Sequence, residues 1–147
     1  MKFEIIQSDN EEKDFNEFLR AQLREYNNRI SLPHLQARQP GAVVPINLIL
    51  KDSSGLILGG LWGETYWNWL EIEKFYIPEE LRGSGIGSQM LHSAEVIGIQ
   101  RGCQHCFLTT FEFQARRFYE KRGYRISGTL HDFPPGSAYY WMVKDLN

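Results

Sequence analysis

A glycine-rich segment that could bind phosphate lies near the middle of the chain, at Arg82-Gly83-Ser84-Gly85-Ile86-Gly87-Ser88. It follows the apolar and aromatic segment 69–77, which is typical of a strand. It precedes a segment in which Ile86, Met90, Ala94 and Ile97 fall on one helical face. A glycine turn at a helix start exposes backbone N–H groups beside the positive end of the helix dipole. The pattern therefore predicts a site for the phosphate groups of a ligand.

Three kinds of phosphate-binding loop can be compared with this segment. A Walker loop needs a lysine that reaches the terminal phosphates, and the segment contains none. A dinucleotide loop needs Gly-x-Gly-x-x-Gly, but Ser88 holds the third glycine position and Gly87 comes one residue early. The pattern Arg/Gln-x-x-Gly-x-Gly/Ala is matched in full by Arg82, Gly85 and Gly87. The remaining alternative is a glycine-rich turn that binds no ligand.

Two ordered motifs resemble the signatures of the GNAT superfamily of N-acetyltransferases, which use acetyl-coenzyme A. The glycine segment is similar to the pyrophosphate loop of that superfamily. The segment Ala115-Arg116-Arg117-Phe118-Tyr119-Glu120-Lys121-Arg122-Gly123-Tyr124 is similar to its second signature, Ala-x-x-hydrophobic-Tyr-x-x-x-Gly-Phe/Tyr. Together the motifs span roughly residues 70–125, and the distance between them fits the superfamily.

The resemblance implies an α/β (α+β) fold in a single domain over residues 1–147, with a mixed, twisted sheet and helices on both faces. The order of the predicted elements along the chain, β-α-α-β-β-β-α-β-α-β-β, agrees with that fold. The first strand is expected at Met1–Ile6, and a helix follows a capping box from Ser8 to Glu11. Residues 27–42, with Pro33 and Pro40, form either a loop or a broken second helix. The other strands are expected at residues 43–50, 56–62, 69–77, 106–110, 123–130 and 139–143.

The helix between the strands at 69–77 and 106–110 implies a right-handed crossover between parallel strands. Gly102 occupies the position of a left-handed helix cap after this helix. By resemblance, the two strands splay apart, and acetyl-coenzyme A enters the split.

The resemblance also implies residue roles. Tyr119 matches the tyrosine that gives a proton to the departing coenzyme A thiolate; the alternative is a core aromatic. Glu71 and Glu73 alternate onto one face of their strand and are candidates for the base that takes the ammonium proton; the alternative is a pair of solvated carboxylates. A backbone N–H near Ile77 would stabilise the oxyanion. The implied cofactor-binding residues are Phe75, Tyr76, Ile77, Arg82, Gly83, Ser84, Gly85, Ile86, Gly87, Ser88, Glu112 and Tyr119.

The chain departs from the family pattern at Glu112, where many members have an asparagine that contacts the pantetheine arm. Either Glu112 or Gln114 takes that role, or Glu112 faces the acceptor amine. Four aromatic residues gather around the strand before the glycine motif: Trp62, Tyr66, Trp67 and Trp69. They either pack in the sheet or form an aromatic wall for a cationic acceptor.

Composition excludes several classes of protein. The net charge of −2 gives no reason to expect nucleic acid as a partner. The basic residues within 115–125 either form a solvated helix face or attract an anionic cofactor.

No run of eighteen apolar residues and no signal-peptide pattern is found, so we expect a cytoplasmic protein without a membrane partner. Cys103-Gln104-His105-Cys106 lacks a second ligand pair, so reduced, partly buried thiols are expected and no metal.

The sequence therefore predicts an N-acetyltransferase that moves the acetyl group of acetyl-coenzyme A to a primary amine of a small molecule. The amine attacks directly in a ternary complex. Two alternatives stay open: an acetyltransferase for protein lysines or N-termini, and a coenzyme A-binding sensor module without turnover. The oligomeric state also stays open, and a homodimer, which is common in the superfamily, is one possibility.

Overall fold

The computed structural model describes residues 1–146, which form two compact units. The first unit is residues 1–39, and the second begins at Pro40. The prediction of one domain over the whole chain stays a prediction. No helix among the described residues is long and apolar enough to cross a membrane.

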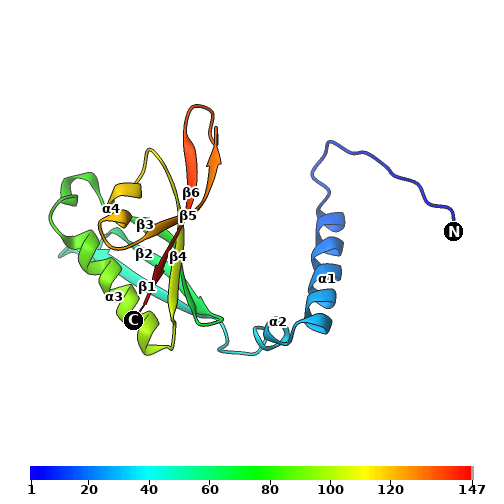
Figure 1. Cartoon of the computed structure of the whole chain (residues 1–147), viewed down its shortest axis with the longest axis horizontal. Helices are drawn as coiled ribbons and strands as arrows, with labels where there is room; N and C mark the ends of the chain where they lie inside the picture. The colour runs from blue at the N-terminus through cyan, green and yellow to red at the C-terminus, as the bar shows by residue number, and fades with distance from the viewer. Residues whose placement is uncertain (147) are drawn as a thin grey trace. The chain divides into compact units, whose positions relative to one another are not determined.

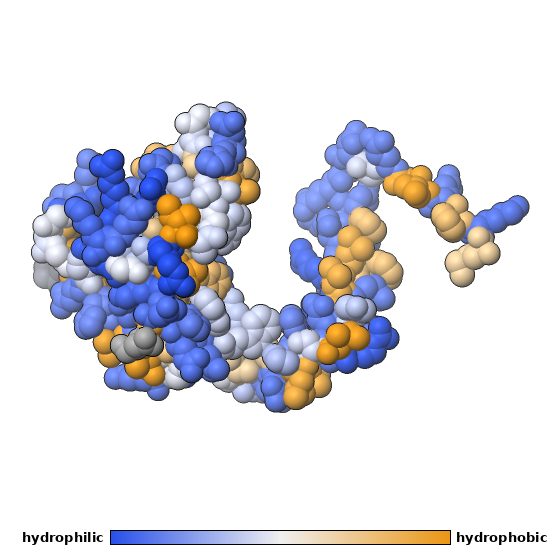
Figure 2. Space-filling model, in the orientation of Figure 1, coloured by the Kyte–Doolittle hydropathy of each residue, from blue (hydrophilic) through white to orange (hydrophobic). Residues whose placement is uncertain are grey.

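The first unit contains two helices, α1 (Lys13–Ile30) and α2 (Leu32–Gln36). Helix α1 has the amphipathic pattern that the sequence predicted, and Figure 2 shows apolar and polar side chains side by side along it. Helix α2 begins with Pro33 in its first turn, where the missing N–H costs no hydrogen bond. The open question over residues 27–42 is thus resolved in favour of a short second helix.

Two predictions for the first unit are wrong. Residues 1–6 form no strand, because extended backbone becomes a strand only where a neighbouring strand pairs with it. The capping box at Ser8 and Glu11 is also absent. The Ser8 hydroxyl donates instead to the Glu12 carboxylate at 2.6 Å, and α1 starts after Glu12 without a side-chain cap.

The second unit is built on a six-stranded sheet in the order β1-β2-β3-β4-β6-β5 (Figure 1). Its strands are β1 (Val44–Lys51), β2 (Ile57–Tyr66), β3 (Trp69–Tyr76), β4 (His105–Phe111), β5 (Arg125–His131) and β6 (Ala138–Asp145). All neighbours are antiparallel except β3 and β4, which are parallel. The mixed α/β fold class and the parallel crossover are therefore confirmed.

Helix α3 (Ile86–Gln100) packs one face of this sheet closely. Ala94 is fully buried, and a Cβ added at Gly98 would lie 3.3 Å from the Leu70 side chain. These small residues let the helix approach the strands. On the predicted apolar face of the helix, Met90 and Ala94 are buried, and Ile86 and Ile97 are half-buried. The largest fully buried side chains come from the helix and from the sheet: Leu91 of α3 and Leu70, Cys106, Leu108 and Met142 of the strands.

Strands β3 and β4 separate after a short parallel ladder. Residues 69–72 pair with residues 105–108, and no pairing follows beyond Ile72 and Leu108. On the other side of β3, Gly63 pairs with Ile72 while Trp62 pairs with Lys74, so Glu73 is the extra residue of a β-bulge. A bulge bends its strand and increases its twist, and bulges are common beside active sites. The predicted splay is confirmed, and the bulge lies at its start.

Glu95 of α3 forms an ion pair with Lys144 of β6 beneath the helix. Lys144 Nζ lies 2.9 and 3.0 Å from the two Glu95 oxygens, and the Tyr124 hydroxyl donates to Glu95 at 2.9 Å. The same hydroxyl lies 3.2 Å from Cys106 Sγ. Cys103 and Cys106 are both free and buried, and burial raises the pKa of Cys106 to about 12. The thiols therefore stay protonated at neutral pH, as expected for reduced, structural cysteines.

Replacing Lys144 with Met should lower the free energy of unfolding by about 1–3 kcal/mol at pH 7. Glu95 would keep the Tyr124 hydrogen bond but lose the cation that neutralises it. The lysine side chain is 26% exposed, so water limits the loss. Urea denaturation measures the change, with the exposed Lys121→Met as control, for which a shift below about 0.5 kcal/mol is expected. Equal midpoints for the two variants would contradict the prediction.

Candidate active site

The glycine segment forms the entrance to α3. The 3₁₀ turn η1 (Glu79–Leu81) leads into it, and Gly85 is the residue that precedes the helix. Gly83 and Gly85 have φ angles of +78° and +90°, and a Cβ added to either would meet no atom within 4 Å. The space above the loop is therefore open to a ligand. The Ser84 hydroxyl donates to the Leu81 carbonyl at 2.6 Å and holds the loop in this shape.

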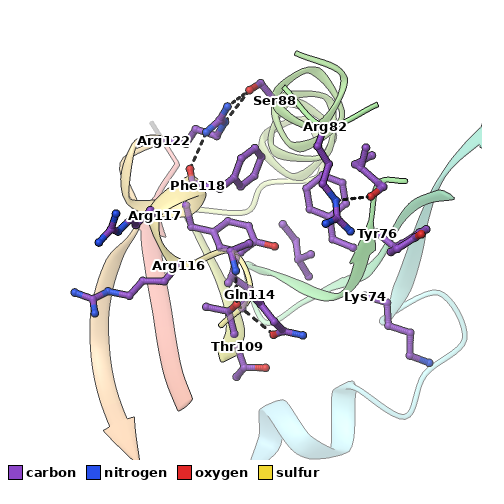
Figure 3. Close-up of a pocket in the computed structure, with 18 of the residues that line it drawn as sticks. Lys74, Tyr76, Arg82, Ser88, Thr109, Gln114, Arg116, Arg117, Phe118 and Arg122 are labelled. Atoms are coloured by element: carbon purple, nitrogen blue, oxygen red, sulfur yellow. Dashed lines mark hydrogen bonds between the residues drawn. The ribbon is translucent and has the colours of Figure 1, made fainter. Parts of the chain in front are cut away.

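A cavity of about 1150 Å³ lies where β3 and β4 separate, slightly larger than the usual small-molecule site of about 300–1,000 Å³ (Figure 3). The loop, β3, β4 and α4 (Arg116–Glu120) form its walls. It brings together most residues that the resemblance implied: Glu73, Phe75, Tyr76, Ile77, Arg82, Gly83, Gly85, Gly87, Ser88, Glu112 and Tyr119. Three of the implied residues, Glu71, Ser84 and Ile86, do not line it.

Positive charge dominates the lining of the cavity. The lining residues include two carboxylates, Glu73 and Glu112, and five cations, of which Arg116 pairs with Glu112 and Glu120; the cations are Lys74, Arg82, Arg116, Arg117 and Arg122. A concave site with an excess of one charge concentrates ligands of the opposite charge. The basic run at 115–125 therefore contributes to an anion-attracting wall.

Arg122 has a structural role that the sequence did not reveal. Its guanidinium donates to the Ser88 hydroxyl and, at 2.8 Å, to the Phe118 carbonyl. Its Cζ also lies 3.7 Å from the centroid of the Phe118 ring. Figure 3 shows these bonds joining α4 to the first turn of α3. On the other side, Arg82 donates to the Ile77 carbonyl at 3.0 Å.

Tyr119 lies at the inner wall of the cavity and is 6% exposed. Its ring meets those of Phe118 and Tyr124 edge-on, with centroids 5.2 and 5.7 Å away. Burial raises the pKa of Tyr119 to about 12. The hydroxyl therefore keeps its proton at neutral pH and can donate it.

The two candidate carboxylates occupy different surroundings, because the bulge interrupts the alternation that the sequence implied. Glu73, the bulged residue, is exposed and lines the cavity. Glu71 is half-buried and accepts a short hydrogen bond from the Tyr66 hydroxyl. Only Glu73 of this pair can therefore meet a ligand in the cavity directly.

Glu112 and Gln114 are held in different ways. Glu112 lies 3.0 Å from Arg116 Nη1, and hydrogen bonds from Tyr140 and Arg116 lower the pKa of its carboxyl. Gln114 accepts the Phe111 backbone N–H through Oε1 at 2.9 Å, which leaves its amide NH₂ as a donor at the cavity wall. Gln114 thus offers an amide donor while Glu112 is paired with Arg116, and which of the two takes the asparagine role stays a prediction.

Comparisons with known proteins agree with this geometry. The acetyltransferase (GNAT) family model matches residues 4–124. A blasticidin-S acetyltransferase from Streptomyces morookaense is 36% identical over 93 residues, which are 63% of this chain and 68% of that protein.

Solved structures agree as well. The crystal structure of an acetyltransferase from Bacillus cereus is 33% identical, with a TM-score of 0.82 over 96% of this chain and 98% of that one. A streptothricin acetyltransferase from Bacillus anthracis, solved with acetyl coenzyme A, shares the fold at 20% identity, with a TM-score of 0.55 over 62% and 57% of the two chains. With the glycine loop, the strand split and the family match in agreement, the chain belongs to the GNAT family of acetyltransferases.

Proposed function

We propose that this chain transfers the acetyl group of acetyl-coenzyme A to a primary amine of a small molecule. One observation carries the proposal: the cavity at the strand split joins the glycine loop, Tyr119 and Glu73. The similarity to a protein named as a blasticidin-S acetyltransferase favours a small-molecule acceptor over a protein side chain.

The residues present fit the cofactor. The open space above Gly83 and Gly85 admits the pyrophosphate to the first-turn N–H groups of α3, which have no carbonyl partner within the helix. Arg122 and Arg82 add positive charge on either side. The edge of β3 from Phe75 to Ile77, freed from β4 by the split, offers backbone groups to the pantetheine arm. Acetyl-coenzyme A, when bound, supplies an acetyl group activated as a thioester.

Two side chains would move protons. Glu73 would accept a proton from the acceptor ammonium, directly or through water, because an amine attacks only when it is neutral. Tyr119 would donate its proton to the departing thiolate. A backbone N–H near Ile77 would donate to the acetyl carbonyl oxygen, where negative charge develops. All of these groups belong to the lining of one cavity.

Free-thiol release from acetyl-coenzyme A tests the proposal across amines, polyamines, aminoglycosides and peptides. We expect turnover with small amines and little with peptides. Turnover with peptides alone would favour a protein acetyltransferase. Thermal stabilisation by acetyl-coenzyme A without turnover would favour a sensor module; ligand at a hundred times its Kd would stabilise by about 2.7 kcal/mol.

Substituting Gly85 should weaken cofactor binding specifically. At a φ of +90°, alanine is strained, and the N–H groups of the loop would shift. Gly85→Ala should raise the KM for acetyl-coenzyme A about tenfold. Gly55→Ala is the matched control, because Gly55 has a φ of +89°, equally open space and a place in the β1–β2 turn. Both variants should lose similar stability, and an equal rise in KM for both would contradict the prediction.

A further inference from the structure

A second, aromatic hollow of about 360 Å³ opens on the sheet face opposite α3. Leu70 packs against α3, and strand alternation places its neighbours Trp69 and Glu71 on the other face. The lining of the hollow includes Tyr66, Trp67, Trp69, Phe107 and Trp141. Trp67 and Trp141 are 47% and 38% exposed. Aromatic rings bind cations over their faces.

Glu71 lies beside the hollow, because it accepts a hydrogen bond from the hydroxyl of Tyr66, which lines the hollow. Glu64 and Glu71 are direct partners in the β2–β3 register, where like charges destabilise a sheet. Within residues 1–146, neither forms an ion pair with a lysine, arginine or histidine. The Tyr66 hydroxyl donates to Glu71, and burial together with that carboxylate raises the pKa of Tyr66, so the donor stays protonated. The remaining negative charge is complementary to a cationic ligand.

Trp67 occupies a backbone conformation that a bulky residue rarely adopts. Trp67 and Asn68 have φ angles of +49° and +60°, the pattern of a type I′ hairpin turn, which favours asparagine and glycine. An aromatic residue at the first of these positions is an outlier. Outliers of this kind gather at ligand sites, where the side chain has a use that outweighs the strain.

The cofactor cavity and the hollow share no lining residue, but strand β3 contributes to the walls of both. Glu73 lines the cavity, Glu71 lies about 7 Å back along β3, and Trp69 lies about 13 Å back, at roughly 3.3 Å per residue. An acceptor with its amine at Glu73 would extend a second group over Glu71 toward the hollow.

We propose that the acceptor is a small molecule that carries a guanidinium group in addition to its amine. The guanidinium would stack on the aromatic rings of the hollow and pair with the carboxylates of Glu71 and Glu64. The proposal rests on the acetyl transfer proposed above, to which it adds the acceptor class. Guanidinium stacks on aromatic faces and pairs with carboxylates in a planar fork, so it uses both features of the site.

Binding of two probes to the full chain tests the proposal without turnover. Agmatine carries an amine and a guanidinium, and n-butylamine carries the amine alone. By calorimetric titration, agmatine should bind at least tenfold more tightly. Glu71→Gln and Trp141→Leu should each remove about tenfold of that affinity, whereas Glu79→Gln, which loses an exposed carboxylate on η1, should not. Equal affinity for the two probes would overturn the proposal.

Trp67→Gly separates a binding role from a structural one. Glycine suits the positive φ, so the midpoint of thermal unfolding should stay within about 4 °C of the unmodified chain. The affinity for agmatine should nevertheless fall several-fold. A lower midpoint with unchanged affinity would overturn the proposal.

Thiol release keeps this test distinct from that of the proposed function. Tight agmatine binding without thiol release from acetyl-coenzyme A would support the cation site and overturn the transfer. Thiol release with equal kcat/KM for agmatine and n-butylamine would support the acetyl transfer and overturn the cation site.

Discussion

Replacing Tyr119 with Phe should lower kcat about 10²- to 10³-fold and leave the KM for acetyl-coenzyme A within about threefold. The substitution removes one hydroxyl and keeps the ring, which packs between Phe118 and Tyr124. The departing thiolate would lose its proton donor, while the contacts that bind the cofactor would remain. Steady-state kinetics of thiol release at saturating acceptor measure the effect.

Tyr124→Phe is the matched control for this variant. Tyr124 is also a buried tyrosine with a raised pKa, but its hydroxyl bonds to Glu95 and Cys106 and does not line the cavity. Its loss should reduce stability and leave kcat nearly unchanged. The proton-donor role of Tyr119 is refuted if Tyr119→Phe keeps full turnover, or if both variants lose kcat equally.

The raised pKa of Tyr119 also predicts a pH dependence. With a pKa of about 12, the hydroxyl stays protonated, so kcat should hold its alkaline plateau to about pH 10–11 and fall as the pH nears 12. The free energy of unfolding should also fall as the pH rises. The neutral form is favoured in the fold, so its contribution is complete below the ordinary pKa of 10.0 and is lost as the pH rises through about 12. An alkaline limb that begins near pH 8 would contradict this assignment.

Glu73→Gln should lower kcat/KM about 10²-fold at pH 7 and far less near pH 10. An acceptor ammonium with a lysine-like pKa of about 10.4 is largely deprotonated only at high pH, where a base is no longer needed. The deficit of the variant should therefore shrink as the pH rises. A pH–rate profile from pH 6 to 10 measures this convergence.

Glu71→Gln is the control variant for Glu73→Gln. Glu71 does not line the cavity and accepts the Tyr66 hydroxyl, so its loss should change kcat less than about threefold. Its effect should instead fall on the KM of cationic acceptors. A deficit in Glu73→Gln that is constant with pH, or that Glu71→Gln matches, would remove Glu73 as the base.

The glycine motif shows how much local sequence could predict. A left-handed glycine before a helix, the apolar face of that helix and the glycine at its end depend on residues within a few positions of one another. Helix α3 therefore begins at the expected Ile86, and Gly102 has the expected left-handed φ of +84°. The second motif, through its resemblance to the family signature, likewise pointed to Tyr119, which lines the cavity.

Other features depended on pairing between distant residues. The N-terminal strand is absent because its formation needs a partner that residues 1–6 do not carry themselves. The bulge at Glu73 arises from the register between β2 and β3, and it alone separates the surroundings of Glu73 from those of Glu71. Hydrophobic alternation cannot reveal one inserted residue when the strand is polar there.

The sequence by itself, through two motifs that resemble the family's signatures, pointed to the family, the glycine loop and Tyr119, because each motif involves only residues close together in the chain. Only the tertiary structure decided which carboxylate reaches the cavity, and that Arg122 joins α4 to the loop. It also gathered Trp141 of β6 with Trp67 and Trp69 around one hollow. These juxtapositions join residues tens of positions apart, and the pairing of strands across the sheet brings them into contact.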